Sequence, residues 1–232
     1  GTIDAGEGKQ GSGFGAEIGG AEDGANTFTL NNAGTIQGRG DAAAGTNLSG
    51  DGVRIGNPGN SGTTDATITN AGEILSEGAN GTVAGVRVVN GVNFQGELSN
   101  AGLIAGIQNG VYFGTGDHTG GSFVNEEGGV VSSDSRALNI DGKGLSVENA
   151  GQIIGTADQR NGTAYADGTA DDFSVVNSGS IDAGEGNQGS GFGAEIGGAE
   201  DGVNSFTLDN SGTIQGRGNA AAGTSLAGDG IR

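Results

Sequence analysis

The chain has 232 residues, a formal net charge of −19 and no Cys, with 54 Gly and only 46 Leu, Ile, Val and Phe residues together. The absence of Cys excludes a disulfide framework and thiol catalysis, and the acidic balance disfavours nucleic acid or an anionic membrane as a partner. Because this composition lies at the border of disorder, only a repeating pattern can predict a folded structure.

A long repeat is the first such pattern. Residues 1–54 return as residues 179–232, and only ten of these 54 positions differ. We therefore expect one 178-residue unit, 1–178, and the start of a near-identical unit, 179–232, continuous with it. No stretch approaches the ~20 apolar residues that span a bilayer. The sequence begins inside one copy without a leader and stops inside the next, so we expect it to be a segment of a longer protein.

A shorter repeat, Asn-x-Gly-x-Ile, lies inside the long one. Successive Asn residues are 38, 30, 25, 24, 28 and 33 residues apart, which divides the long repeat into six short ones. Such periods indicate a solenoid. The seven Asn residues, one of them in the looser version Asn-Glu-Glu-Gly, are Asn32, Asn70, Asn100, Asn125, Asn149, Asn177 and Asn210.

Three short strands are expected in each repeat. An apolar residue stands two positions before each Asn, and the spacing of two indicates a strand that ends at the Asn. A second strand follows the Gly, with its Ile directed inward. A third is indicated at 15–18, 52–55, 85–88, 110–113 and 137–140. Repeats of this kind, without helical periodicity, predict the coils of an all-β parallel β-helix.

Stacking of identical positions explains the composition. Each strand would pair with its counterpart one coil away, so that apolar residues form a narrow core and the Asn side chains bond along a column. We expect the Asn to adopt left-handed geometry and the Gly to permit the bend. Coil length varies mainly between the second and third strands, which predicts loops at one corner. The coil 149–177 shows no clear third strand.

The Asn-x-Gly-x-Ile repeats, with third strands such as Gly52-Val53-Arg54-Ile55, resemble the passenger regions of bacterial autotransporters and the long β-strand-repeat adhesins of Gram-negative surfaces. The resemblance covers essentially the whole chain. It implies a right-handed parallel β-helix that is secreted and displayed at the cell surface or outside a Gram-negative cell. The near-identity of the long repeats favours a fibre or array over a compact effector.

Three motifs that carry chemistry elsewhere are interpreted as loops. Gly6–Gly11 matches G-x-G-x-x-G, but no helix start follows to bind a pyrophosphate. Arg39-Gly40-Asp41 spells an integrin-binding tripeptide, which the second copy replaces with Arg217-Gly218-Asn219. His118, the only histidine, lies in a glycine-rich stretch that indicates a loop tip. We predict no catalytic residues and no required cofactor, and hence no enzyme.

The outward positions of the third strands form the candidate contact face. Glu17 and Arg54 would make an exposed ion ladder there, and Arg54, Arg87 and Tyr112 are candidates for contact with surface glycans. Surface calcium is a second candidate ligand, since carboxylates lie among glycines as hard cations require. The residues concerned are Asp4, Glu7, Glu22, Asp23 and Asp51, although no known calcium motif is matched and no metal site can be assigned.

The sequence therefore predicts a structural and interaction protein. We expect a rigid segment of a fibre, coat or adhesin stalk whose partners are copies of itself, adjacent repeats of the same chain, or surface glycans and host or other cell surfaces. No nucleic acid and no membrane insertion of this segment are expected. The alternative is a glycan-binding or glycan-cleaving passenger domain, which would need clustered carboxylates and a base on an exposed strand face.

Overall fold

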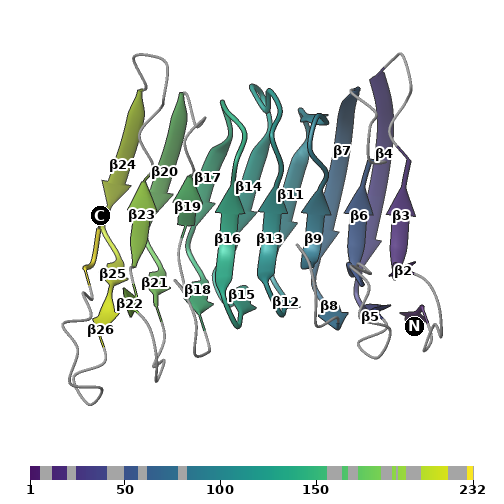
Figure 1. The fold of residues 1–232 in the computed structure, drawn as a ribbon, viewed down its shortest axis with the longest axis horizontal. Coiled ribbons are helices and arrows are strands. Elements are labelled where there is room, and N and C mark those ends of the chain that lie inside the picture. The colour runs from purple at the N-terminus through teal and green to yellow at the C-terminus, as the bar shows by residue number, and fades with distance from the viewer. Residues whose placement is uncertain are drawn as a thin grey trace.

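The computed structural model describes residues 1–5, 12–19, 25–40, 50–56, 62–77, 83–155, 164–166, 172–183, 190–191, 193–196, 205–218 and 229–231. All elements of this part of the chain are strands, and all but three short ones fall into three parallel sheets. Figure 1 shows the strands side by side along the longest axis of the molecule, in chain order from one end to the other. The predicted parallel β-helix is confirmed.

Sheet C holds the strands that end at the Asn residues, together with the short strand β10, which pairs with β7. Because each of them pairs in parallel with the corresponding strand of the next coil, the sheet runs the length of the molecule. Its strands are β4 (Ala25–Asn32), β7 (Thr63–Asn70), β10 (Asn93–Phe94), β11 (Glu97–Asn100), β14 (Ser122–Asn125), β17 (Ser146–Asn149), β20 (Phe173–Asn177) and β24 (Phe206–Asn210).

Sheet A follows the Asn turn in every coil. Its parallel strands are β1 (Thr2–Asp4), β5 (Thr35–Gly40), β8 (Glu73–Glu77), β12 (Leu103–Gly106), β15 (Val130–Ser133), β18 (Gln152–Gly155), β21 (Ser180–Asp182) and β25 (Thr213–Gln215). A short antiparallel strand, β2 (Ser12–Gly13), pairs with β5, and the second copy repeats this with β22 (Ser190–Gly191) and β26 (Arg217–Gly218).

Sheet B completes each coil with β3 (Ala16–Ile18), β6 (Val53–Ile55), β9 (Ala84–Val88), β13 (Asn109–Phe113), β16 (Arg136–Ile140), β19 (Ala164–Ala166) and β23 (Ala194–Ile196). Strand β19 corrects the expectation that the coil 149–177 has no clear third strand, since it pairs with both β16 and β23. The Ala-Tyr-Ala sequence of this strand carries too little apolar pattern to reveal it.

The hand of the helix follows from the path of one coil. In Figure 1 the chain descends the rear sheet C, crosses below through sheet A and rises along the front sheet B while it advances from the N-terminal to the C-terminal end. This path is right-handed, as expected. Strands β21, β23 and β24 of the second copy pair with strands of the first copy in the three parallel sheets, so the solenoid continues from one long repeat into the next.

The core is a set of stacked columns inside the three sheets. Alternation along the strands of sheets A and C directs every second side chain inward, and the register keeps equivalent side chains of neighbouring coils adjacent. The buried residues include Ile36, Ile74, Ile104, Val131, Ile153 and Ile181 in sheet A and Ile68, Leu98, Phe123, Val147 and Val175 in sheet C. A narrow core therefore suffices for a chain with few large apolar residues.

Candidate functional site

The seven predicted Asn residues form one hydrogen-bonded ladder. Each Nδ2 donates to the Oδ1 of the next Asn, at distances of 2.7, 2.8, 2.8, 2.8, 2.7 and 2.6 Å from Asn32 to Asn210. The same Nδ2 also donates to a carbonyl of the next coil, as from Asn32 to Glu73 O at 3.0 Å. The ladder satisfies polar groups inside the turn, which makes it a structural feature.

The turn geometry differs from the expectation in one respect. Among the described residues that are not Gly, only Asp172 has a positive φ, so none of the ladder Asn residues is left-handed. The Gly of the turn is needed for close approach instead. A Cβ on Gly102 would collide with the carbonyl oxygen of Gly72, and Gly72 has the same relation to Gly34. The backbones of neighbouring turns are thus in direct contact.

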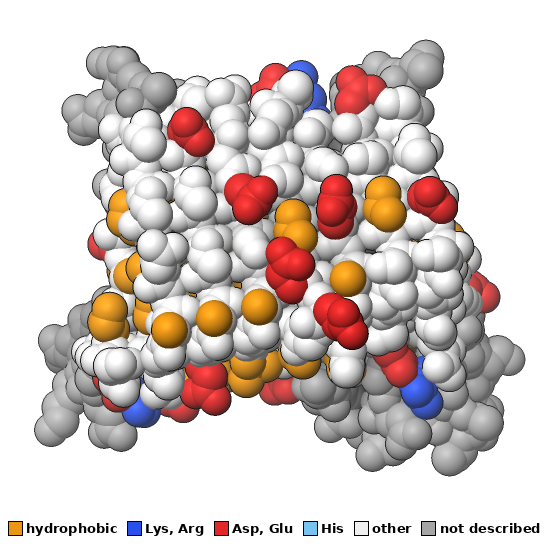
Figure 2. Space-filling model, turned by 180° about the vertical axis from the view of Figure 1, so that it is seen from behind, with side chains coloured by type: hydrophobic (Ala, Val, Ile, Leu, Met, Phe, Trp, Pro, Cys, Tyr) orange, Lys and Arg blue, Asp and Glu red, His pale blue; other side chains and the backbone are white. Residues whose placement is uncertain are grey.

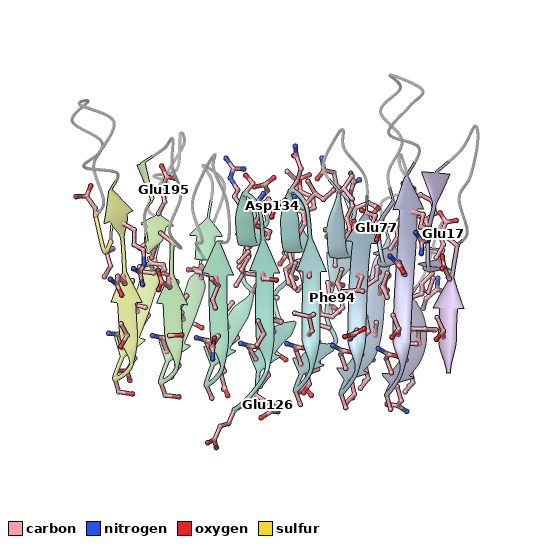
Figure 3. All side chains as sticks on the ribbon, turned by 90° about the horizontal axis from the view of Figure 1, so that it is seen from below. Glu17, Glu77, Phe94, Glu126, Asp134 and Glu195 are labelled. Carbon is pink, nitrogen blue, oxygen red and sulfur yellow. The ribbon has the colours of Figure 1, made fainter. Side chains whose placement is uncertain are left out.

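The outward positions of sheet B align as predicted. Glu17 pairs with Arg54, Arg54 with Arg87, Arg87 with Tyr112, and Tyr112 with Asn139. We call these five residues the sheet B row. Figure 3 labels Glu17 at the N-terminal end of the molecule, where the row begins.

The sheet B row is largely covered, although it lies on the outer side of the sheet. Arg54 is 7% exposed and Tyr112 4% exposed, and the Arg87 side chain is 15% exposed. Arg54 Cζ lies 4.5 Å from the centre of the Phe14 ring, and Arg87 Cζ lies 5.8 Å from that of Tyr112. The predicted pair of Glu17 with Arg54 is present, with 3.9 Å between Glu17 Oε1 and Arg54 Nη1. The expected exposure is wrong for Arg54, because flanking side chains such as Phe14 stack over it.

A buried carboxylate lies beside the row. Asp51 is fully buried; its Oδ1 accepts a hydrogen bond from the Ala84 amide at 3.0 Å, and its Oδ2 lies 3.8 Å from Arg87 Nη1. Burial raises the pKa of Asp51 to about 6, with the nearby guanidinium of Arg87 opposing the shift. Burial likewise lowers the pKa of Arg54.

Tyr112 is held in place by hydrogen bonds. Its hydroxyl lies 2.7 Å from Asp141 Oδ2 and 2.9 Å from Asn90 Oδ1. Burial, followed by the hydrogen bond to Asp141, raises the pKa of Tyr112 above its ordinary value. The polar ends of Arg54, Arg87 and Tyr112 thus engage neighbouring residues. That these three contact glycans stays a prediction, to be weighed against their low exposure.

Two of the calcium candidates are found in ion pairs. Asp4 binds Arg39 through both oxygens, with 2.7 Å to Nε and 3.0 Å to Nη2. Asp51 is buried beside Arg87, as described above. Glu7, Glu22 and Asp23 lie outside the described residues, and among those that are described no three His, Asp or Glu side chains gather as a metal site would need.

The arginine of the Arg-Gly-Asp motif forms ion pairs between coils. Arg39 also lies 3.0 Å from Glu77 Oε2, so it links three successive strands of sheet A. Arg217 makes the equivalent pair with Asp182 in the second copy, at 2.7 Å. Asp41 and the whole of the Gly6–Gly11 motif lie outside the described residues.

A shallow groove of about 240 Å³ crosses the edge of sheet A toward sheet B. Its lining includes Leu75, Ala105 and Ile107, with Glu77 and Asp134 among the polar residues. Figure 3 shows Glu77 and Asp134 along the same edge of the sheet. Very short connections join β12 and β15 to the next strands, in sheet B, at this edge.

The outer face of sheet C is flat and carries no Lys or Arg among its described residues. Figure 2 shows this face, with acidic side chains spread among uncharged ones. Asp65, Glu97, Glu148 and Asp209 are exposed there, one each on β7, β11, β17 and β24.

His118 does not lie at the loop tip that its glycine-rich stretch predicts. It is fully buried at the corner where sheet B leads into sheet C. Its neighbours Phe94 and Phe113 come from other segments of the chain, so the local stretch Gly-Thr-Gly-Asp-His-Thr-Gly-Gly gives no sign of this burial.

No family model, curated protein or solved structure matches the chain. The described residues also contain no helix long and apolar enough to cross a membrane.

Proposed function

We propose that the chain is a rigid segment of a tandemly repeated, secreted bacterial surface protein that forms a fibre, coat or adhesin stalk. Its role is mechanical and interactive, without a catalytic step. Its partners are copies of itself or adjacent repeats of the same chain, and surface glycans or cell surfaces at the exposed loops.

The boundary between the two long repeats is the observation that supports this proposal. At this boundary Asn177 donates to Asn210 at 2.6 Å, and the rings of Phe173 and Phe206 stack with centres 5.7 Å apart. Strand β21 of the second copy pairs with β18 of the first in full register. A unit whose last coil receives the first coil of its copy is suited to a rod of any number of units.

Extension of the chain by one further copy of residues 1–178, placed before residue 1, tests whether the repeats form one continuous rod. Six coils at ~4.8 Å should lengthen the particle by about 29 Å in electron micrographs, and the midpoint of urea unfolding should not fall. The matched control carries Asp at Val175 of the added copy and at Ile3 of the original chain. These two residues take the places at the new boundary that the buried Val175 and Ile181 hold at the existing one. Extended chains that form two separate short particles joined by a linker would contradict the proposal, and so would a control that lengthens equally.

Surface display is tested separately. Antibodies raised against the 232-residue chain should label intact cells of the organism that makes it, and external protease should remove the signal. Labelling that requires lysis of the cells would contradict display.

A further inference from the structure

His118 joins three coils at the corner between sheets B and C. Its backbone amide donates to Lys143 O at 2.8 Å in the next coil, and its carbonyl accepts from Gly121 N at 2.8 Å. Its side chain reaches back to β10 of the preceding coil. One residue therefore makes contacts with the coils on both sides of its own.

Both ring nitrogens of His118 are engaged. The Phe94 amide donates to Nδ1 at 3.1 Å, so Nδ1 must carry a lone pair. Nε2 lies 2.9 Å from the Gly114 carbonyl oxygen, which can only accept, so Nε2 carries the proton. This arrangement fits one tautomer of the neutral imidazole and leaves no nitrogen free to take a second proton.

The surroundings give the ring no room to turn. The Phe113 ring centre lies 5.6 Å from that of His118 in an edge arrangement, and Phe113 packs similarly on Phe94 at 5.4 Å. A Cβ at Gly142 would collide with Nε2 of the imidazole, so the backbone of the next coil closes the remaining side. Rotation of χ2 could not save the Phe94 hydrogen bond after protonation, because both nitrogens of the charged imidazole are donors and neither can accept from the Phe94 amide.

Few charges act on the ring. Asp117 is the nearest one, and it is engaged by the Thr119 amide at 3.1 Å and by Lys143 Nζ at 3.6 Å near the surface. At this corner β10 contributes Asn93 and Phe94 and β13 contributes Phe113, none of them charged. Burial lowers the pKa of His118, and the Gly114 carbonyl and Asp117 only partly oppose the shift.

We propose that His118 is an acid-sensitive latch, which holds the corner of three coils closed while it is neutral and releases it when it is protonated. Protonation turns Nδ1 from an acceptor into a donor that faces the donor amide of Phe94. The bond from Phe94 is lost and a positive charge is left among Phe94, Phe113 and glycine backbone, which favours opening of the corner to water. The proposal is independent of the rod function.

Because His118 is the only histidine, one imidazole resonance in the NMR spectrum of the labelled 232-residue chain reports its titration. We expect this resonance to titrate below the ordinary value of 6.5, because burial lowers the pKa of His118. In parallel, the hydrogen-exchange protection factor of the Phe94 amide should fall by up to about tenfold per pH unit below the same midpoint. The amide of Ile36, in β5 and remote from His118, is the internal control and should keep its protection over this range.

The variant His118→Asn sharpens the test. Its Oδ1 can replace Nδ1 as the acceptor for Phe94 but does not titrate, so protection at Phe94 should become independent of pH relative to the Ile36 control. Titration of the wild-type imidazole near 6.5 with unchanged protection at Phe94 would overturn the latch, as would an unaltered acid response in His118→Asn. If the variant does not fold, the wild-type titration decides alone.

Discussion

Ile3 and Ile181 occupy the same position in the two copies of the long repeat, yet Ile3 is 51% exposed and Ile181 is 1% exposed. Their local sequences are nearly identical, so the difference arises from their neighbours. Strand β1, which carries Ile3, pairs with β5 alone among the parallel strands described, whereas β21 lies between β18 and β25. Burial in this fold is supplied by adjacent coils.

The pair Ile3→Ala and Ile181→Ala measures this dependence. Truncation at Ile181 should lower the free energy of unfolding by about 2–4 kcal/mol, because it leaves a cavity between two coils. The same truncation at Ile3 should cost less than about 1 kcal/mol, because that side chain is half in water. Urea unfolding followed by circular dichroism gives both values, and equal costs at the two positions would contradict the neighbour effect.

Asn100→Ala interrupts the Asn ladder at its middle. The change removes two bonds of the ladder. The Nδ2 of Asn70 keeps its carbonyl partner Leu103 O at 3.1 Å, whereas the buried Oδ1 of Asn125 loses the Nδ2 of Asn100. We expect a loss of about 2–4 kcal/mol of unfolding free energy, with roughly 1–3 kcal/mol for the unsatisfied Oδ1 and about 1 kcal/mol for the second lost bond. Asn210→Ala is the control, since Asn210 is exposed and should cost about 1 kcal/mol in the same urea titration.

Gly102→Ala tests the contact between neighbouring turns. The added methyl group would overlap the Gly72 carbonyl, so we expect a loss of at least about 2 kcal/mol, visible as a lower melting temperature. The substitution Ala101→Ser, at the exposed residue that precedes Gly102, is the control. Ser stands at the equivalent position in two other turns, as Ser178 and Ser211, and Ala101→Ser should change the melting temperature little. A neutral Gly102→Ala would refute the close-approach role of the turn glycine.

Asp51 makes stability depend on pH in a defined direction. Because its pKa is raised from 3.8 to about 6 in the folded chain, its contribution is fully present below pH 3.8 and is lost as the pH rises to about 6. The variant Asp51→Asn keeps an acceptor for the Ala84 amide without this charge. Its unfolding free energy relative to wild type should therefore increase by about 1–3 kcal/mol from pH 4 to pH 7.

Urea titrations of both proteins at each pH provide the comparison, and the other carboxylates cancel between them. A difference that stays constant from pH 4 to pH 7 would show that the ion pair with Arg87 cancels the effect of burial on the pKa of Asp51. Reversal of the sign would contradict the raised pKa altogether.

The regular part of the fold could be predicted from the sequence because each coil repeats the same inward residues. Leu30, Ile68 and Leu98 precede their Asn residues by the same two positions, and the structure stacks them in one column. In a repeat protein, equivalent positions of successive repeats contact each other, so the spacing of the repeats predicts contacts that the sequence of an ordinary globular protein does not reveal. The alignment of Arg54 with Arg87 followed from the same register.

The irregular corners could not be predicted, because their contacts join segments without a repeat. Nothing near His118 in the sequence points to Phe94, 24 residues earlier. The burial of Asp51 and Arg54 likewise depends on the residues that pack beside them, such as Phe14 over Arg54 and Ala84 beside Asp51. A polar residue next to glycine is expected to be exposed. In this fold, glycine instead allows neighbouring backbone to come close and cover the polar side chain.

The parallel pairing of the coils has a consequence under tension. The hydrogen bonds between coils run along the axis of the solenoid, so a pull on its two ends loads the outermost coil first and detaches one coil at a time. Each coil adds ~4.8 Å to the folded length but contains 24 to 38 residues, which extend to roughly 80 to 130 Å. A solenoid of this design would therefore unfold one coil at a time under load and lengthen many times over.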